Sequence, residues 1–169
     1  MPISQSLLRQ YGARGTLSKA TVDEALRQRR QTAFLCHSHL DMHLVKGVQK
    51  FLNDQGWHVY VDWQDQSMPP QPSRETALKI QRRIKELNWF LFLATENSMA
   101  SRWCPWELGF ADGAKPYDSI LVIPTRDLSG RSHGNEYIQL YRRVDESHGL
   151  IGAFLPNGNG NLVRGMVPP

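Results

Sequence analysis

Trp89-Phe90-Leu91-Phe92-Leu93-Ala94-Thr95 is the stretch of sequence that decides the fold. Every residue before Thr95 is apolar, without the alternation of apolar and polar residues that marks a strand with one face in water. Strands that are apolar throughout are typical of parallel sheets, in which helices cover both faces. The sequence therefore predicts a central buried strand over residues 89–95.

Strand and helix patterns alternate on both sides of this stretch. The other expected strands lie at 32–37, 58–63 and 119–124, with a fifth between 141 and 154. Apolar residues at helical spacing fill the segments between them, at 38–55, 73–87 and from about 104 to 115, and a short helix is expected near 136–142. This alternation predicts an α/β fold, an open doubly wound, flavodoxin-like parallel sheet of five strands with helices on both faces.

The chain of 169 residues has the length of one domain with a single sizeable core. We expect residues 32–155 to form this domain and residues 1–31 to form an N-terminal extension. Thr21-Val22-Asp23-Glu24 has the spacing of a capping box, which predicts one helix in the extension after a flexible arm. Glycine and asparagine dominate residues 157–161, so the tail 156–169 is expected to pack poorly.

Two further polar stretches indicate where helices begin. Ser38-His39-Leu40-Asp41 follows the first strand and has the spacing of a capping box. Ser73 follows a proline-rich segment and is expected to cap the helix after it.

The composition is that of a soluble globular protein, with 40% hydrophobic and 21% charged residues. No run approaches the roughly 20 apolar residues that cross a bilayer, and the N-terminus lacks the apolar centre of a signal peptide, so we expect a cytoplasmic protein without a membrane partner. The net charge of +4 comes with scattered basic pairs and no nucleic-acid recognition motif, so no nucleic-acid partner is expected. Cys36 and Cys104 are too few for a disulfide scaffold, and both are expected to be reduced.

The octapeptide Ser101-Arg102-Trp103-Cys104-Pro105-Trp106-Glu107-Leu108 carries the most unusual composition. Proline is tolerated in the first turn of a helix, so the helix is expected to start near Cys104 with Glu107 in its first turn, where amide dipoles favour an ionised carboxylate. Trp103 lies four residues before Glu107 and shares its face, so the pair can hold an electron-poor ring and stabilise a cation. A purely structural role, with a carboxylate that complements the helix dipole beside two core tryptophans, stays open at this point.

Three unusual segments follow predicted strands, at 38–41, 63–72 and 96–107. Ligands of open parallel sheets bind beyond the carboxyl ends of the strands. We therefore expect the three segments to share one ligand-binding edge.

Histidines near the first strand raise the question of a metal site, because His39 and His43 are four residues apart, with His37 and Cys36 nearby. If the strand continues, however, His37 and His39 point to opposite sides, and no second ligand cluster follows. We therefore expect no metal.

Acidic residues near strand ends, Asp41, Asp62 and Asp65, suggest the pocket of a phospho-accepting receiver domain. A receiver needs an aspartate at the end of its third strand, where this chain has Ala94-Thr95. The spacing excludes that class.

The chain resembles the Toll/interleukin-1 receptor (TIR) domain family, especially its bacterial enzymatic members. The resemblance is carried by Ala33-Phe34-Leu35-Cys36-His37-Ser38-His39 with Asp41, by Tyr60-Val61-Asp62-Trp63, and by Ser101-Arg102-Trp103-Cys104 with Glu107-Leu108. It spans residues 32 to about 124, with weaker similarity to about 155. Among bacterial members, the chain is similar to the stand-alone TIR proteins of Thoeris antiphage defence.

This resemblance implies an enzyme that cleaves the nicotinamide–ribose bond of NAD, with Glu107 as the catalytic residue and NAD as substrate rather than cofactor. The implied substrate-binding residues are Phe34, Ser38, His39, Asp62, Trp63, Trp103 and Cys104. Ser38 and the helix after it are expected to meet the pyrophosphate, and Trp63 is open to either core packing or nucleotide stacking. The implied product is an ADP-ribose derived signal, a cyclic ADP-ribose isomer, which a separate effector protein reads. The resemblance also implies a homo-oligomer formed through TIR–TIR contacts. The family also contains non-catalytic scaffolds that act through protein–protein contacts, which is the alternative function.

Overall fold

A parallel sheet lies at the centre of the computed structural model, which describes residues 1–14, 21–147, 150–154 and 160–162. In the described residues its parallel strands follow the order β3 (His58–Tyr60), β2 (Thr32–Cys36), β4 (Trp89–Ala94), β5 (Ile120–Arg126) and β6 (Arg142–Ser147). The strand over the apolar stretch is the middle one of these five. The prediction of a five-stranded, open parallel α/β sheet is confirmed.

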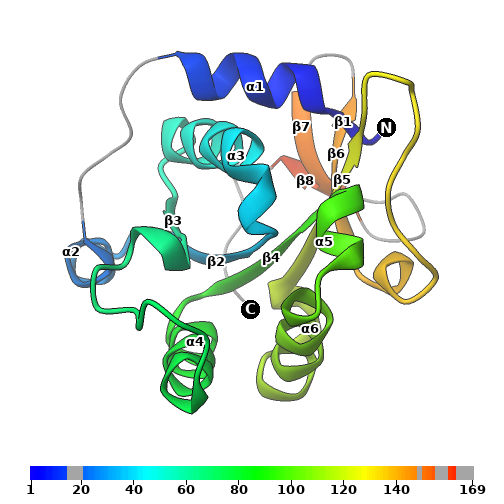
Figure 1. The fold of residues 1–169 in the computed structure, drawn as a ribbon. Helices are drawn as coiled ribbons and strands as arrows, with labels where there is room; N and C mark the ends of the chain where they lie inside the picture. The colour runs from blue at the N-terminus through cyan, green and yellow to red at the C-terminus, as the bar shows by residue number, and fades with distance from the viewer. Residues whose placement is uncertain (15–20, 148–149, 155–159, 163–169) are drawn as a thin grey trace.

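Helices cover both faces of this sheet (Figure 1). One face carries α1 (Gln5–Ala13) and α3 (Met42–Asp54), and the other carries α2 (Val22–Arg27), α4 (Arg74–Glu86) and α6 (Trp103–Ala114). Side chains of β4 alternate between the two cores: Trp89, Leu91 and Leu93 face α3, and Phe90, Phe92 and Ala94 face α4 and α6. A strand buried in this way on both sides needs no polar residue, which explains the uninterrupted apolar sequence.

Short elements complete the described chain. They are α5 (Glu96–Ala100) and the 3₁₀ turns η1 (His39–Asp41), η2 (Asp62–Gln64), η3 (Tyr117–Ser119) and η4 (Ile138–Leu140). The short helix expected near 136–142 is the single turn η4. Beyond β6 the sheet continues with β7 (Leu150–Phe154) and β8 (Gly160–Leu162), both antiparallel to their neighbours. These two strands were not predicted, and β8 is the described part of the tail expected to pack poorly.

The N-terminal extension differs from the expected flexible arm. Residues 3–4 form β1 (Ile3–Ser4), parallel to β5, and α1 follows it directly and packs across α3. Ile3 and Leu8 are buried in the core beneath α1. A Cβ on Gly47 of α3 would lie 2.0 Å from the backbone oxygen of Leu8, so only glycine allows the two helices to approach this closely. The described residues 1–14 of the extension therefore pack against the domain, while the second helix, α2, begins at the predicted capping box on Thr21.

Candidate functional site

The carboxyl ends of β3, β2 and β4 lead into the three unusual segments of the sequence, and these strands are direct neighbours in the sheet. After β2 the chain turns through η1 into α3, after β3 it turns through η2, and after β4 it enters α5 and then α6. The three segments therefore meet at one end of the sheet, as expected, and ligand binding at this edge stays a prediction.

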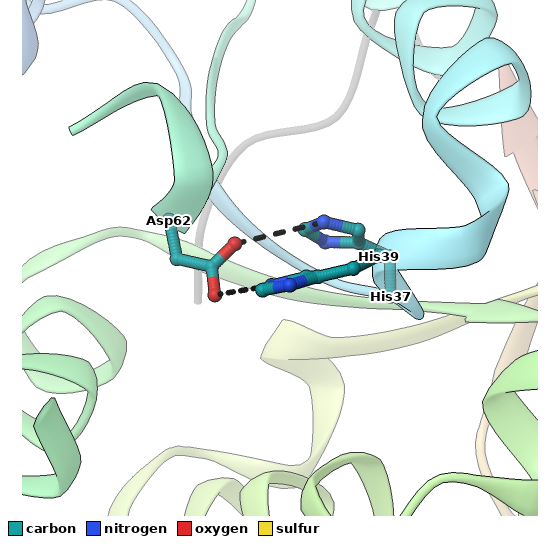
Figure 2. Close-up of side chains that lie close together, drawn as sticks. All are labelled: His37, His39 and Asp62. Carbon is teal, nitrogen blue, oxygen red and sulfur yellow. Dashed lines mark hydrogen bonds and ion pairs between the residues drawn. The ribbon is translucent and has the colours of Figure 1, made fainter. Parts of the chain in front are cut away.

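Three side chains that follow β2 and β3 converge in this region (Figure 2). Nε2 of His39 lies 3.2 Å from Oδ2 of Asp62, and Nε2 of His37 lies 3.6 Å from Oδ1 of the same carboxylate. The imidazole rings of His37 and His39 are 5.7 Å apart, at 33° to each other. The expectation that the two histidines point to opposite sides is wrong. Side chains alternate along a strand, so residues two positions apart share a face. In the structure β2 ends at Cys36, and both rings lie against Asp62.

The electrostatics of the three groups differ. The hydrogen bond with Asp62 raises the pKa of His39, whose side chain is 69% exposed. Burial lowers the pKa of His37, whose side chain is only 2% exposed, and this outweighs the attraction of Asp62. Burial works to raise the pKa of Asp62, but the hydrogen bond with His39 and the two neighbouring histidines lower it overall. Asp62 is thus held as an anion between one buried and one exposed imidazole.

Glu107 projects from α6 into a buried position and is 6% exposed. The helix begins at Trp103, so Glu107 lies past its first turn, and the expected stabilisation by first-turn amides does not apply. Burial raises the pKa of the Glu107 carboxyl well above its ordinary value; the Cys36 thiol acts in the opposite direction, and the charge of Asp62 reinforces the rise. The expectation of a dipole-stabilised, ordinary ionised carboxylate is therefore wrong: Glu107 is a desolvated acid within electrostatic reach of Asp62.

The aromatic and thiol groups around Glu107 have separate surroundings. Trp103 is partly buried against the core and meets the more exposed Trp106 edge to face, with ring centroids 5.4 Å apart. Cys104 is buried, and its carbonyl oxygen accepts a weak hydrogen bond from the Cys36 thiol at 3.8 Å. Both cysteines are free thiols, as expected for reduced residues. Trp103 keeps an accessible part beside the glutamate, whereas the side chain of Cys104 is core.

Of the other residues predicted to bind substrate, some lie at the carboxyl edge of the sheet and some lie in the core. The hydroxyl of Ser38 accepts a hydrogen bond from the Leu40 amide and caps η1, so it does not form the predicted capping box. Phe34 is 2% exposed and packs between Tyr60 and Phe90 at centroid distances of 5.7 and 5.8 Å. Its position within β2 encloses the side chain, and the implied role of Phe34 in substrate binding stays a prediction. Trp63 is partly buried against the α3-side core.

A polar network at the same edge was not predicted as a unit. Asp41 is buried and accepts hydrogen bonds from the Thr95 hydroxyl at 2.5 Å and from the Asn97 amide at 2.7 Å. It thereby ties the turn after β2 to the start of α5. The sequence signal was a carboxylate after one buried strand and a Thr-x-Asn after the next, but which groups would pair depends on the order of strands in the sheet.

In the described residues, no helix is both long and apolar enough to cross a membrane.

The sequence matches the family description TIR domain over residues 33–150. It is similar to the probable 3′ cyclic ADP-D-ribose synthase ThsB′ of Bacillus cereus (strain MSX-D12), with 36% identity over 113 residues, 66% of this chain and 58% of that protein. It is also similar to the putative cyclic ADP-D-ribose synthase TIR2 of Cytobacillus dafuensis, with 28% identity over 81 residues, 46% of this chain and 21% of that protein.

The chain thus spans less than two thirds of the length of each of these relatives. The family match covers the parallel sheet together with the ligand edge, from β2 to the start of β7. With this match and the observed fold, the chain belongs to the TIR domain family.

Proposed function

We propose that this protein is an enzyme that cleaves the nicotinamide–ribose bond of NAD and converts the ADP-ribosyl part into a cyclic ADP-ribose isomer. The observation that carries the proposal is the buried carboxyl of Glu107, next to the carboxyl edge of the sheet and beside the partly accessible Trp103. The names of the two relatives, both of them cyclic ADP-D-ribose synthases, support the same chemistry.

The chemistry of NAD suits a single buried carboxylate. Nicotinamide is a cation while bound to ribose and leaves as a neutral molecule, taking the electron pair of the glycosidic bond, so the departure needs no strong acid. Positive charge then develops on the ribosyl ring. A carboxylate in a desolvated site stabilises such a charge far better than one in water, and this is the role we assign to Glu107.

Cyclisation requires that a group of the same ADP-ribosyl molecule, rather than water, captures the ribosyl cation. That outcome depends on holding the adenine end close to the cation and excluding water for long enough. The accessible part of Trp103 is the surface that we assign to base stacking, and Ser38 with the amides of η1 is the region that we assign to the pyrophosphate.

The remaining parts of the proposal concern partners and setting. We propose that NAD is consumed as the substrate without a redox cofactor, that the chain assembles through TIR–TIR contacts, and that a separate effector protein reads the product. The setting that fits these roles is the cytoplasm of a bacterium with a Thoeris-like antiphage defence.

Incubation of the purified protein with NAD, followed by chromatography and mass spectrometry, tests the proposal. The expected products are free nicotinamide and a species one water lighter than ADP-ribose. If linear ADP-ribose is the sole product, the proposed cyclisation is rejected and the proposed cleavage of NAD stands. No nicotinamide release at any protein concentration, together with binding to other TIR domains, would instead favour a non-catalytic scaffold.

A further inference from the structure

The cluster of His37, His39 and Asp62 has a geometry that a hydrogen-bonded pair alone does not account for (Figure 2). One potential donor atom from each residue lies within 4.8 Å of the other two. The backbone fixes two of the three, because His37 directly follows β2 and Asp62 opens η2 after β3. The Trp63 amide also donates a hydrogen bond to Oδ1 of Asp62 at 2.8 Å, which holds that carboxylate in place.

The hydrogen bonding of His37 determines which ring nitrogen carries its proton. Nδ1 lies 2.8 Å from the carbonyl oxygen of Leu35, which can only accept, so Nδ1 carries the hydrogen. The His37 side chain is only 2% exposed, and burial disfavours a charged ring. In a neutral ring protonated at Nδ1, Nε2 carries a lone pair.

This Nε2 atom is the unusual feature of the site. It is buried, has no hydrogen-bond partner among the described residues, and lies 3.6 Å from an oxygen of the Asp62 carboxylate. A lone pair that faces an anionic oxygen is unfavourable, and a buried polar atom left without a partner costs about 1–3 kcal/mol. A positive ion between the two groups would satisfy both atoms at once.

The distances suit a small transition-metal ion. Zinc–nitrogen bonds of about 2.0–2.1 Å in a tetrahedron place neighbouring donor atoms about 3.3 Å apart. The two histidine–carboxylate separations lie on either side of that value, at 3.2 Å from Nε2 of His39 to Oδ2 of Asp62 and 3.6 Å from Nε2 of His37 to Oδ1 of Asp62. A neutral imidazole whose Nδ1–H binds a backbone carbonyl is also the usual orientation of a histidine ligand.

We propose that His37, His39 and Asp62 bind one divalent transition-metal ion, of the zinc class, through Nε2 of each histidine and the Asp62 carboxylate. Imidazole ligands favour zinc and its neighbours over magnesium or calcium, which prefer oxygen. Three protein ligands leave the fourth coordination position free for water or an anionic oxygen, as in catalytic zinc sites. The largely exposed His39 lies on the solvent side, so that position is open to the ligand edge. This proposal replaces the expectation that the chain holds no metal, and it does not depend on NAD cleavage.

Metal binding to the purified full chain tests the proposal in the absence of NAD. The protein is stripped with a chelator, kept reduced so that Cys36 and Cys104 remain thiols, and titrated with Zn²⁺ by calorimetry; bound metal is measured by mass spectrometry after dialysis. Co²⁺ in place of Zn²⁺ reports coordination through its visible absorption. We expect one ion per chain, the strong absorption of four-coordinate cobalt, and a higher melting temperature with metal.

Variants separate this site from adventitious binding. Asp62→Asn and His37→Gln should weaken binding by at least about 10²-fold, since loss of even an outer-shell partner costs about 10–100-fold. His39→Gln alters an exposed side chain and gives the same result without risk to the core. His133→Gln is the matched control, because His133 pairs with Asp127 at 3.2 Å in a similar histidine–carboxylate contact outside the proposed site. It should keep full binding.

Two outcomes would overturn the proposal. One is the absence of stoichiometric binding, with ¹⁵N NMR showing a proton on Nε2 of His37 at neutral pH, which would make the cluster a hydrogen-bonded charge pair. The other is binding that persists in both His39→Gln and Asp62→Asn. Nicotinamide release is measured separately, so failure of the metal site and failure of the proposed enzymatic function give different results.

Discussion

Replacing Glu107 with glutamine removes one negative charge and keeps the shape and the hydrogen-bonding capacity of the side chain. On the proposed function, the charge acts on the ribosyl cation that develops as nicotinamide leaves. The substitution therefore isolates the electrostatic contribution of this residue.

Burial sets the magnitude of the effect. Two opposite unit charges about 4 Å apart attract by about 1 kcal/mol in bulk water, but by about 4 kcal/mol at an effective dielectric constant of about 20. Glu107 is 6% exposed, so the second value applies. A change of about 4 kcal/mol in the barrier is about 10³-fold in rate, at the upper end of the roughly 10²–10³-fold effects measured for single stabilising groups.

The assay is the initial rate of nicotinamide release across a range of NAD concentrations. Because the charge acts on the transition state, the loss should fall on kcat more than on KM. The matched control is Glu136→Gln, the same substitution at an exposed carboxylate outside the three segments of the ligand edge. A folded Glu107→Gln protein with activity within about 10-fold of the wild type would refute the reasoning, since the buried charge would then contribute no more than a solvent-exposed one.

Three further predictions follow from the same contacts. The free energy of unfolding of Glu107→Gln should exceed that of the wild type at neutral pH, and the difference should shrink as the pH falls toward 4.5, the ordinary glutamate pKa. The reason is that the raised folded-state pKa makes the ionised carboxylate destabilising only above that value. Equal pH dependence of unfolding in the two proteins would contradict this. Gly47→Ala should destabilise the protein by about 1–3 kcal/mol through the clash with the Leu8 backbone, whereas Gly109→Ala, in an exposed helical position with open space, should stabilise it by up to about 1 kcal/mol, as thermal denaturation can check. Charge substitutions at the exposed Gln66 or Gln71 should reduce activity and self-association together if the loop 64–72 is the TIR–TIR contact, and concentration-independent activity of a sedimenting monomer would speak against it.

The fold could be predicted from the sequence where strands are covered by helices on both faces. Every position of β4 is buried, and so is every position of β5 except Arg126, so the apolar runs alone identified both strands and their place between two helix layers. The helix starts at Thr21 and Ser73 were also readable, because a capping box depends on residues only three positions apart. The packing of α1 was not readable: it depends on Gly47, which lies 39 positions beyond Leu8 in the chain.

The location of the candidate site at the carboxyl edge of the sheet was predictable from the sequence, but the arrangement of its side chains was not. Strand order brings Ser38, Asp62 and Glu107 to one region, and the rule for parallel sheets anticipates it. The grouping of His37 and His39 with Asp62 was missed although side chains two positions apart on a strand share a face, because it also depends on β3 lying next to β2 in the sheet. The environment of Glu107 was missed because α6 starts one residue earlier than expected, at Trp103, which places the carboxyl past the first turn, and because its burial depends on packing against the rest of the fold.

The raised pKa of Glu107 and the charge of the proposed substrate belong together. Burial and the negative charge of Asp62 both disfavour a second carboxylate at this edge. The nicotinamide ring of NAD brings a positive charge into the same region, which favours the ionised form of Glu107 when the substrate is bound. Once nicotinamide leaves as a neutral molecule, the positive charge passes to the ribosyl ring and the carboxylate keeps its partner. A reduced nicotinamide carries no such charge, so it would leave the carboxylate desolvated and unpaired. On the proposed function, the cost of burying Glu107 is therefore a source of discrimination between the oxidised and the reduced dinucleotide.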